Sequence, residues 1–268
     1  MPGDRCPPIT TANAQADALA FRENAGRFPG LRRVPRSATS VGTDRRLLLQ
    51  GYVNTVLYRD IVERFNVTNL NVLKILIRHM LQNPATHFTV NKFYHHLKSQ
   101  GIKVAKTTVH EYIDHLRDAF LLYTVPIKAD SERRRMVNPV KVYAADCGLP
   151  DAFALSRDPD LGRLLENCIY MDLCRRGCQV SYIVTSSGFE ADFLAEYFDG
   201  RRQVIQVAAD ISNSDTRERE IRALVEAGRD TKGAELLLLN LSEESSITRE
   251  GLTIEILPAW KWLLDYKL

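Results

Sequence analysis

The sequence predicts a protein of mixed α+β or α/β class, with a helical N-terminal half and an α/β C-terminal half. Apolar residues recur at helical spacing from residue 47 to residue 81. From residue 149 onward, helix-like and strand-like segments alternate to the end of the chain, as in a sheet covered by helices. The composition, 45% hydrophobic and 26% charged over 268 residues, is typical of a globular protein.

Three regions are expected along the chain. Residues 1–46 hold five of the eleven prolines and repeated arginines, which predicts a loosely ordered arm. Residues 47–148 are expected to form a helical domain and residues 149–268 a second, α/β domain. The turn-forming residues 146–150 lie at the boundary between them.

The elements of the first domain follow in order from periodicity and from turn residues. Helices are expected over 47–62, 70–81, 88–97 and 107–117, and Gly101 suits the left-handed position after the third helix. Strands are expected over 120–125 and 140–143, separated by a basic loop at 132–136. Helix, turn, helix, strand, charged loop and strand is the plan of a winged helix.

The second domain is expected to alternate helices and strands. Its segments are a helix over 161–175, a strand over 179–184, two strands over 188–196 and 204–210 joined at Asp199-Gly200, a helix over 216–226, a strand over 236–241, and a final strand and helix within 252–266.

Charge is distributed unevenly along the chain. Residues 51–150 carry 14 basic and 8 acidic side chains, whereas residues 151–268 carry 14 basic and 21 acidic ones. A basic front half and an acidic back half predict that any nucleic-acid contact is made mainly by the front half. DNA is expected as a partner more than RNA, and a protein partner is an open alternative.

A winged helix of this kind would offer several cationic and polar side chains to nucleic acid. Residues of the helix over 107–117 would read a groove, and flanking lysines and the basic loop would contact phosphates. The candidates are Lys92, Lys98, Lys103, Lys106, Thr107, Thr108, His110, Arg133, Arg134 and Arg135.

The second domain carries an incomplete nuclease signature. Nucleases of the PD-(D/E)XK type place an Asp on one strand of a hairpin, and on the next strand a Glu, Asp or Gln followed one residue on by a Lys. Here Asp192 and Gln206 occupy the first two positions, but Ala208 stands where the lysine belongs. Glu166, on the preceding helix, would complete the carboxylate set.

The signature therefore predicts a restriction-endonuclease-like domain without expected catalysis. Alanine supplies no charge, and the loss of one catalytic group typically lowers the rate by about 10²–10³. If the site is active, Glu166, Asp192 and Gln206 are the catalytic candidates, and Glu166 and Asp192 would bind Mg²⁺ or Mn²⁺. An arginine from a neighbouring element, such as Arg217 or Arg222, would then have to replace the lysine.

Other classes of function are disfavoured. The sequence has no P-loop and no dinucleotide-binding glycine motif, so no cofactor and no nucleotide binding are expected. It has no apolar stretch long enough for a membrane span and no secretory signal, which predicts a cytoplasmic protein. The five cysteines are expected to be reduced, and Cys168, Cys174 and Cys178 to be structural thiols.

From about residue 20 onward the chain resembles the C-terminal region of a large prokaryotic family of AAA-type ATPases, classified as domain-of-unknown-function family 4143. The segments that carry this resemblance are Phe28-Pro29, Tyr52 with 57–61, 91–101, 108–120, 138–143, 146–149, 165–167, 190–193, 206–208, Arg219-Glu220 and 258–263. The resemblance implies a winged helix followed by a restriction-endonuclease-like domain. It also implies a P-loop ATPase domain, which this sequence lacks.

Together these observations predict a protein that binds nucleic acid without cleaving it. Two alternatives stay open. One is a metal-dependent nuclease with a displaced basic residue. The other is a protein-interaction module that partners a separate ATPase.

Overall fold

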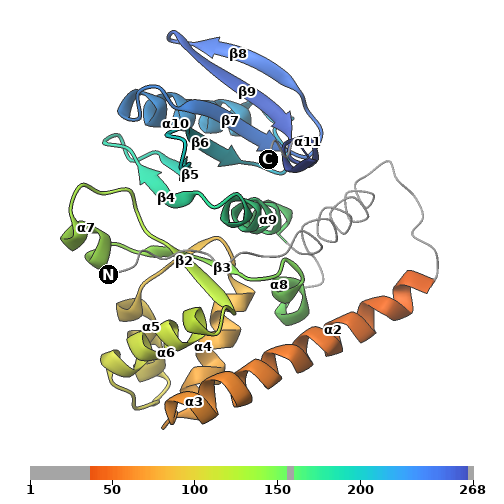
Figure 1. Cartoon of the computed structure of the whole chain (residues 1–268), viewed down its shortest axis with the longest axis vertical. Helices are drawn as coiled ribbons and strands as arrows, with labels where there is room; N and C mark the ends of the chain where they lie inside the picture. The colour runs from red at the N-terminus through yellow and green to blue at the C-terminus, as the bar shows by residue number, and fades with distance from the viewer. Residues whose placement is uncertain (1–36, 156–159, 265–268) are drawn as a thin grey trace. The chain divides into compact units, whose positions relative to one another are not determined.

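The computed structural model describes residues 37–155 and 160–264, with side chains from residue 46 onward (Figure 1). The chain divides into two compact units. We call residues 37–126 and 131–167 the helical unit, and residues 127–130 and 168–264 the sheet unit. The class is mixed α and β, as predicted.

The helical unit consists mainly of helices around one small sheet. Its helices are α2 (Ser37–Thr55), the π-helix η1 (Val56–Val62), α3 (Glu63–Phe65), α4 (Leu70–Gln82), α5 (Val90–Ser99), α6 (Lys106–Asp118), α7 (Glu132–Val137), α8 (Gly148–Phe153) and the first half of α9 (Leu161–Arg175). Its strands are β1 (Thr86–Phe88), β2 (Leu122–Val125) and β3 (Val140–Ala144). They pair antiparallel in the order β1-β3-β2.

One apolar core holds this unit together. Buried side chains from α4, α5 and α6 meet below the sheet, among them Leu76, Phe93 and Leu116. The stripe of apolar residues along each helix explains this packing, because helical spacing places them on one face. Side-chain caps fix the starts of two helices, since Asn69 accepts from the Val72 N–H and Thr89 from the Lys92 N–H.

The expected helices over 70–81, 88–97 and 107–117 are confirmed as α4, α5 and α6, and Gly101 has the left-handed φ of 75°. The first helix starts earlier than expected, at Ser37, so the last ten residues of the expected arm (37–46) are helical. Residues 1–36, including Phe28-Pro29, lie outside the described part of the chain.

The expected basic loop at 132–136 is wrong, because these residues form the helix α7. Ser131 is its N-cap, and its hydroxyl accepts from the Arg134 N–H at 3.4 Å. Glu132 in the first turn and arginines in the last turn both interact favourably with the helix dipole. The three consecutive arginines were interpreted as a charged loop, and these signals for a helix were not used.

The sheet unit is built on a mixed six-stranded sheet in the order β4-β5-β6-β7-β9-β8. The strands are β4 (Gln179–Val184), β5 (Glu190–Glu196), β6 (Arg202–Val207), β7 (Glu235–Asn240), β8 (Ser245–Arg249) and β9 (Leu252–Pro258). The helices are the second half of α9, α10 (Ser214–Asp230) and α11 (Ala259–Leu264). β6, β7 and β9 run parallel, and the other pairs are antiparallel.

Helices cover both faces of this sheet. α10 packs its apolar stripe, including Leu224, against one face. On the other face the Tyr170 ring of α9 stacks on Phe193 of β5, with ring centroids 6.2 Å apart. Because successive side chains of a strand point to opposite faces, Asp192, next to Phe193, faces α10.

The predicted helix over 161–175 and strand over 179–184 are confirmed, as is the Asp199-Gly200 turn between β5 and β6. β8 was not expected, because the segment 245–249 is short and polar. Its turn carries positive φ at both Glu250 (53°) and Gly251 (79°), the pattern of a two-residue hairpin. No helix in the described part of the chain is long and apolar enough to cross a membrane.

Candidate functional site

A buried polar network lies where β5 and β6 separate. The regular strand pairing starts at Phe193 and Ile205, and before that point side chains replace the backbone ladder. The Asp192 N–H donates to Gln206 Oε1 at 3.2 Å, and the Val207 N–H donates to Asp192 Oδ2 at 2.9 Å. Both polar side chains are buried. The structure thus brings together Asp192 and Gln206, two of the residues predicted from the nuclease signature.

A third side chain, Glu220 of α10, completes the network. Gln206 Nε2 donates to Glu220 Oε2 at 2.7 Å, and Arg219 Nη2 donates to Glu220 Oε1 at 2.5 Å. The Glu220–Arg219 contact raises the pKa of the Arg219 guanidinium, which is therefore fully charged. Glu220 was missed as a site residue. Glu220 lies four residues before the buried Leu224, on the apolar face of α10. A carboxylate on an apolar helix face was the feature of the sequence that could have indicated a site residue.

Ala208, where the signature expects lysine, leaves the network without a catalytic cation at that position. Its N–H donates to the Leu239 carbonyl at 3.0 Å, so its backbone is committed to the sheet. Arg217 pairs with Glu243 at 2.6 Å, and Arg222 lies over the Phe189 ring at 4.6 Å. Neither arginine replaces the missing lysine in this structure.

The donor set of this network does not fit a divalent cation. The Gln206 carbonyl accepts from the Asp192 N–H, and its amide group faces Glu220. In the described residues no three His, Cys, Asp or Glu side chains are grouped closely enough to hold a metal. Magnesium prefers several oxygen ligands and keeps part of its water shell. The network formed by Asp192, Gln206 and Glu220 therefore does not provide a site for a divalent cation.

Glu166 lies in the helical unit, where it makes a buried ion pair. Its Oε1 accepts from Lys141 Nζ at 3.0 Å and from the Tyr143 hydroxyl at 2.7 Å. Only 4% of the Lys141 side chain and 10% of the Glu166 side chain are exposed. The next residue, Asn167, accepts from the Ala144 N–H and donates back to the Ala144 carbonyl. These contacts fasten α9 to β3, which gives Glu166 a structural role in its own unit.

The helical unit also presents the basic residues predicted for nucleic-acid contact. Lys92 and Lys98 lie on α5, Lys103 precedes α6, and Lys106 begins it. All four are exposed. Within the described part of the chain, none of them forms an ion pair with a carboxylate.

The start of α6 is an exposed turn with polar and cationic side chains. Lys106 Nζ donates to Asn91 Oδ1 at 2.7 Å and lies 5.1 Å from the centre of the Tyr94 ring, which holds the ammonium group between α5 and α6. Thr107 and His110 are exposed, and Thr108 is half-buried. The N-cap is Ala105, which has no side chain to bind the first N–H groups of the helix.

The arginines of α7 differ from one another. Arg135 pairs with Glu132 one turn earlier, at 3.8 Å, and is half-buried. Arg133 and Arg134 are exposed, and neither has a carboxylate partner among the described residues. Arg133 and Arg134 are therefore the more available cations of this helix.

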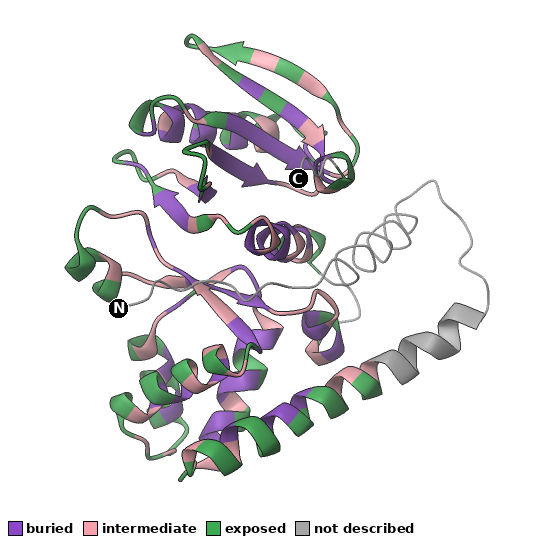
Figure 2. Ribbon diagram, in the orientation of Figure 1, coloured by how far each residue is buried: buried purple, intermediate pink, exposed green. Residues whose placement is uncertain are grey.

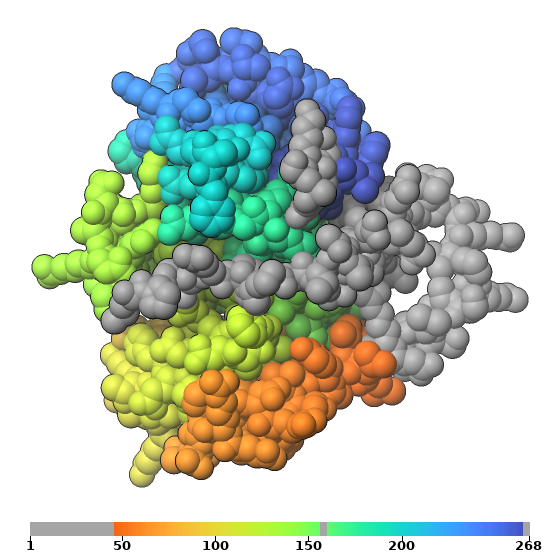
Figure 3. Space-filling model, in the orientation of Figure 1, coloured from red at the N-terminus to blue at the C-terminus, as the bar shows by residue number. Residues whose placement is uncertain are grey.

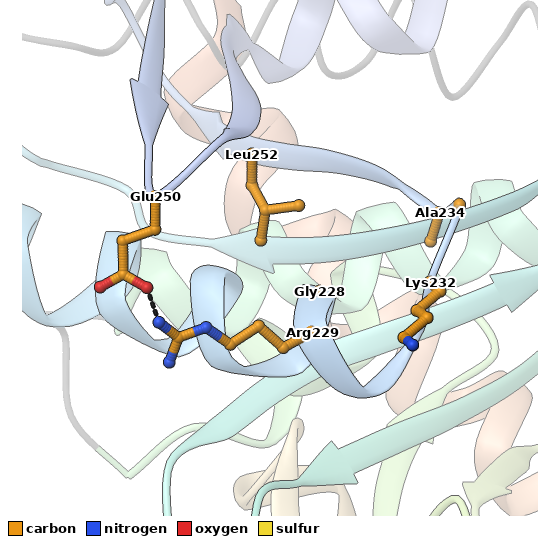
Figure 4. Close-up of a pocket in the computed structure, with 7 residues that line it drawn as sticks. Gly228, Arg229, Lys232, Ala234, Glu250 and Leu252 are labelled. Atoms are coloured by element: carbon orange, nitrogen blue, oxygen red, sulfur yellow. Dashed lines mark ion pairs between the residues drawn. The ribbon is translucent and has the colours of Figure 1, made fainter.

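A shallow pocket of about 390 Å³ lies at the C-terminal end of α10 (Figure 4). Arg229 and Glu250 in its wall form an ion pair and neutralise each other. Lys232 is its other cation. Glu220 precedes Arg229 by nine residues on α10, a rise of roughly 13 Å. The pocket is thus separate from the buried network, and no residue predicted from the sequence lines it.

No cysteine in the described part of the chain forms a disulfide bond. Cys174 is buried, and Cys168 and Cys178 are partly buried. The Cys178 thiol donates to the Leu173 carbonyl at 2.9 Å, and burial raises its pKa to about 12. These thiols have the structural character expected from the sequence.

Two curated relatives are described as uncharacterized proteins. An uncharacterized protein of Methanocaldococcus jannaschii, MJ1544, is 29% identical over 231 residues, which are 83% of this chain and 51% of the relative. An uncharacterized protein of Haemophilus influenzae is 26% identical over 167 residues, which are 62% of this chain and 41% of the relative. The chain spans about half the length of these relatives or less.

A family model described as a domain of unknown function, DUF8612, matches residues 26–160. The match includes α2 to α8 and thus most of the helical unit. It covers half of the chain. The chain therefore belongs to the family of the domain of unknown function DUF8612.

Proposed function

We propose that this protein binds nucleic acid, with duplex DNA as the preferred form, through the helical unit and without cleaving it. The observation that carries the proposal is a set of exposed cations without carboxylate partners among the described residues. They are Lys92, Lys98, Lys103, Lys106, Arg133 and Arg134. Cations that are not neutralised within the protein are available to phosphates, which dominate the affinity of proteins for DNA.

The order of elements in the helical unit supports a winged-helix arrangement. Strand β1 lies between α4 and α5, helix α6 follows, and β2 and β3 pair antiparallel with β3 in the middle of the sheet. In such a unit α6 would be the reading helix, and its first turn carries Lys106, Thr107 and His110. The uncapped N–H groups of that turn favour a phosphate oxygen.

The sheet unit supports a restriction-endonuclease-like scaffold that has lost its chemistry. An antiparallel β5–β6 hairpin leads through α10 into the parallel strand β7, and Asp192 and Gln206 lie on the hairpin. Hydrogen bonds already occupy Gln206 on both sides, and Ala208 provides no cation. These two features support the proposed absence of cleavage.

We also propose descent from the AAA-type ATPases of domain-of-unknown-function family 4143. The motifs named in the sequence support it, and so does the extra length of the relatives, which are about twice as long as the part they share with this chain. Sequencing the neighbouring genomic DNA tests this: a P-loop ATPase domain in the same or an adjacent reading frame is expected.

Fluorescence anisotropy of an end-labelled duplex tests the binding itself. We expect wild-type protein to bind at 50 mM salt, and the variant with Lys92, Lys98 and Lys103 changed to Ala to bind at least tenfold more weakly. A matched control changes Arg201 and Arg229, two exposed arginines of the sheet unit, to Ala, and its affinity should equal that of wild type.

Three results would contradict the proposal in different ways. Absence of binding at 50 mM salt would remove the nucleic-acid function, and co-purification of another polypeptide would then favour a protein-interaction module. If the control variant lost as much affinity as the lysine variant, the DNA contact would not be specific to the helical unit. Metal-dependent cleavage that Asp192→Asn abolishes would show an active nuclease.

A further inference from the structure

Helix α7 presents two apolar side chains beside its exposed arginines. Met136 is 79% exposed and Val137 is 73% exposed, on the last turn of the helix. They follow three consecutive arginines, Arg133, Arg134 and Arg135, so cationic and apolar side chains share a helix of six residues. Figure 2 shows most of this helix as exposed, and in Figure 3 a side chain of the light-green segment that contains it projects outward. Met136 and Val137 are adjacent, so they form a small exposed apolar patch next to cationic side chains.

The helix is held at both ends and is therefore a preformed projection. Ser131 caps its start through the Arg134 N–H. At its end the Asn138 side chain and backbone N–H both donate to the Arg134 carbonyl, at 2.6 and 3.3 Å. β2 lies on its N-terminal side in the sequence and β3 on its C-terminal side, and these two strands pair with each other. The segment is thus already ordered before it binds a partner, so little conformational entropy is lost on binding.

We propose that α7 inserts into the minor groove of duplex DNA, where Met136, assisted by Val137, wedges between two base pairs and kinks the duplex. The proposal rests on the nucleic-acid binding proposed above and specifies how the duplex is held. Arginine is the side chain best suited to the negative potential of a narrow minor groove. Apolar wedges such as methionine partly unstack a base step and bend the duplex by about 20–90°. Arg133 and Arg134 supply the cationic side chains for the groove, and Met136 supplies the apolar wedge.

The size and charge of the patch favour DNA over other occupants. Specific protein interfaces involve about 20–30 residues on each side, whereas α7 offers six residues. Helices that lie in a membrane surface bury a continuous apolar face, whereas α7 exposes two apolar side chains. A base-step wedge requires only one or two apolar side chains, flanked by cations.

The test measures DNA bending and binding in the same samples. A duplex of 20 base pairs carries a fluorescent donor and an acceptor at its ends, so bending raises the transfer efficiency, and anisotropy reports binding. The full chain is compared with Met136→Ala/Val137→Ala. Leu155→Ala is the matched control, because Leu155 is 89% exposed and lies in the same unit. We expect wild type and the control to raise the transfer efficiency, and the double variant to lose most of that rise while its affinity falls about threefold to tenfold.

Each other outcome overturns the inference in a recognisable way. Binding by wild type with no change in transfer, or an unchanged rise in the double variant, would refute the wedge and leave the proposed function standing. Absence of binding would refute both. A further arm uses vesicles of phosphatidylserine and phosphatidylcholine. Sedimentation with these vesicles that Met136→Ala/Val137→Ala abolishes, without DNA bending, would identify a membrane surface as the occupant instead.

Discussion

Removal of the Glu166 carboxylate should destabilise the helical unit strongly, because it breaks a buried ion pair with the Lys141 ammonium group. Lys141 Nζ lies 3.0 Å from Glu166 Oε1, and 4% of its side chain is exposed. Breaking a buried ion pair by removing one partner costs about 3–5 kcal/mol. In Glu166→Ala the Tyr143 hydroxyl also loses its acceptor. We therefore expect a loss of about 4 kcal/mol in the free energy of unfolding.

Urea unfolding followed by circular dichroism at 222 nm measures this loss, since the helical unit holds most of the helices. With an m-value of about 2 kcal/mol per molar urea, the midpoint should fall by about 2 M. Asp114→Ala is the matched control, because the Asp114–Arg117 pair of the same unit is exposed, with 65% and 35% of the two side chains accessible. Exposed pairs contribute about 0–1 kcal/mol, so the control should shift the midpoint by less than about 0.5 M.

A second variant separates the loss of charge balance from the loss of packing. In Lys141→Met/Glu166→Leu neither charge of this pair remains, and we expect at least half of the lost free energy of unfolding to return. The reasoning is refuted if Glu166→Ala shifts the midpoint no more than Asp114→Ala does. A carboxylate retained for metal binding rather than for structure would give that result, since functional groups are often costly to stability.

Three further predictions concern the sheet unit. Ala208→Lys should leave supercoiled plasmid intact in Mg²⁺ or Mn²⁺, because Gln206 is already bonded on both sides; nicking that Asp192→Asn removes would show that the site is still complete. Gln206→Ala should lower the free energy of unfolding by about 2–3 kcal/mol, since the Asp192 N–H and the buried Glu220 each lose a partner; tryptophan fluorescence in urea checks this, and an unchanged midpoint would contradict it. The raised pKa of Cys178, about 12, should keep it unlabelled by iodoacetamide at pH 8 in the folded protein, as mass spectrometry can show. The same shift predicts stability that falls as the pH rises above about 8.5, the ordinary thiol value, and rapid labelling of the native thiol would contradict the burial.

Much of the fold was predictable because local signals agreed with the tertiary structure. The helices α4, α5 and α6 have strong apolar stripes, and the strand β7 contains a continuous run of four leucines between turns. α7 and β8 were missed for the opposite reason. Each is short and polar, and depends on a cap or a turn, Ser131 in one case and Glu250-Gly251 in the other.

The candidate site was predictable only in part. The hairpin pattern placed Asp192 and Gln206 on neighbouring strands, and the structure brings them into hydrogen-bonding contact. Glu220 could not be placed beside them from the sequence, because its position depends on how α10 packs across the sheet. Glu166 is bonded to Lys141 and Tyr143. Both lie more than 20 residues earlier, on β3, so only tertiary packing brings them to Glu166.

The salt dependence of duplex binding tests the central claim most directly. Neutralisation of about six DNA charges by Lys92, Lys98, Lys103, Lys106, Arg133 and Arg134 predicts a slope of log affinity against log salt of about −5, which is a loss of about 10³ in affinity between 50 and 200 mM salt. Changing Arg133 and Arg134 to Ala should reduce the magnitude of the slope by about two, whereas changing Arg201 and Arg229 to Ala should leave the slope unchanged. A slope near zero, or the same slope in both pairs of variants, would contradict recognition of nucleic acid by the helical unit.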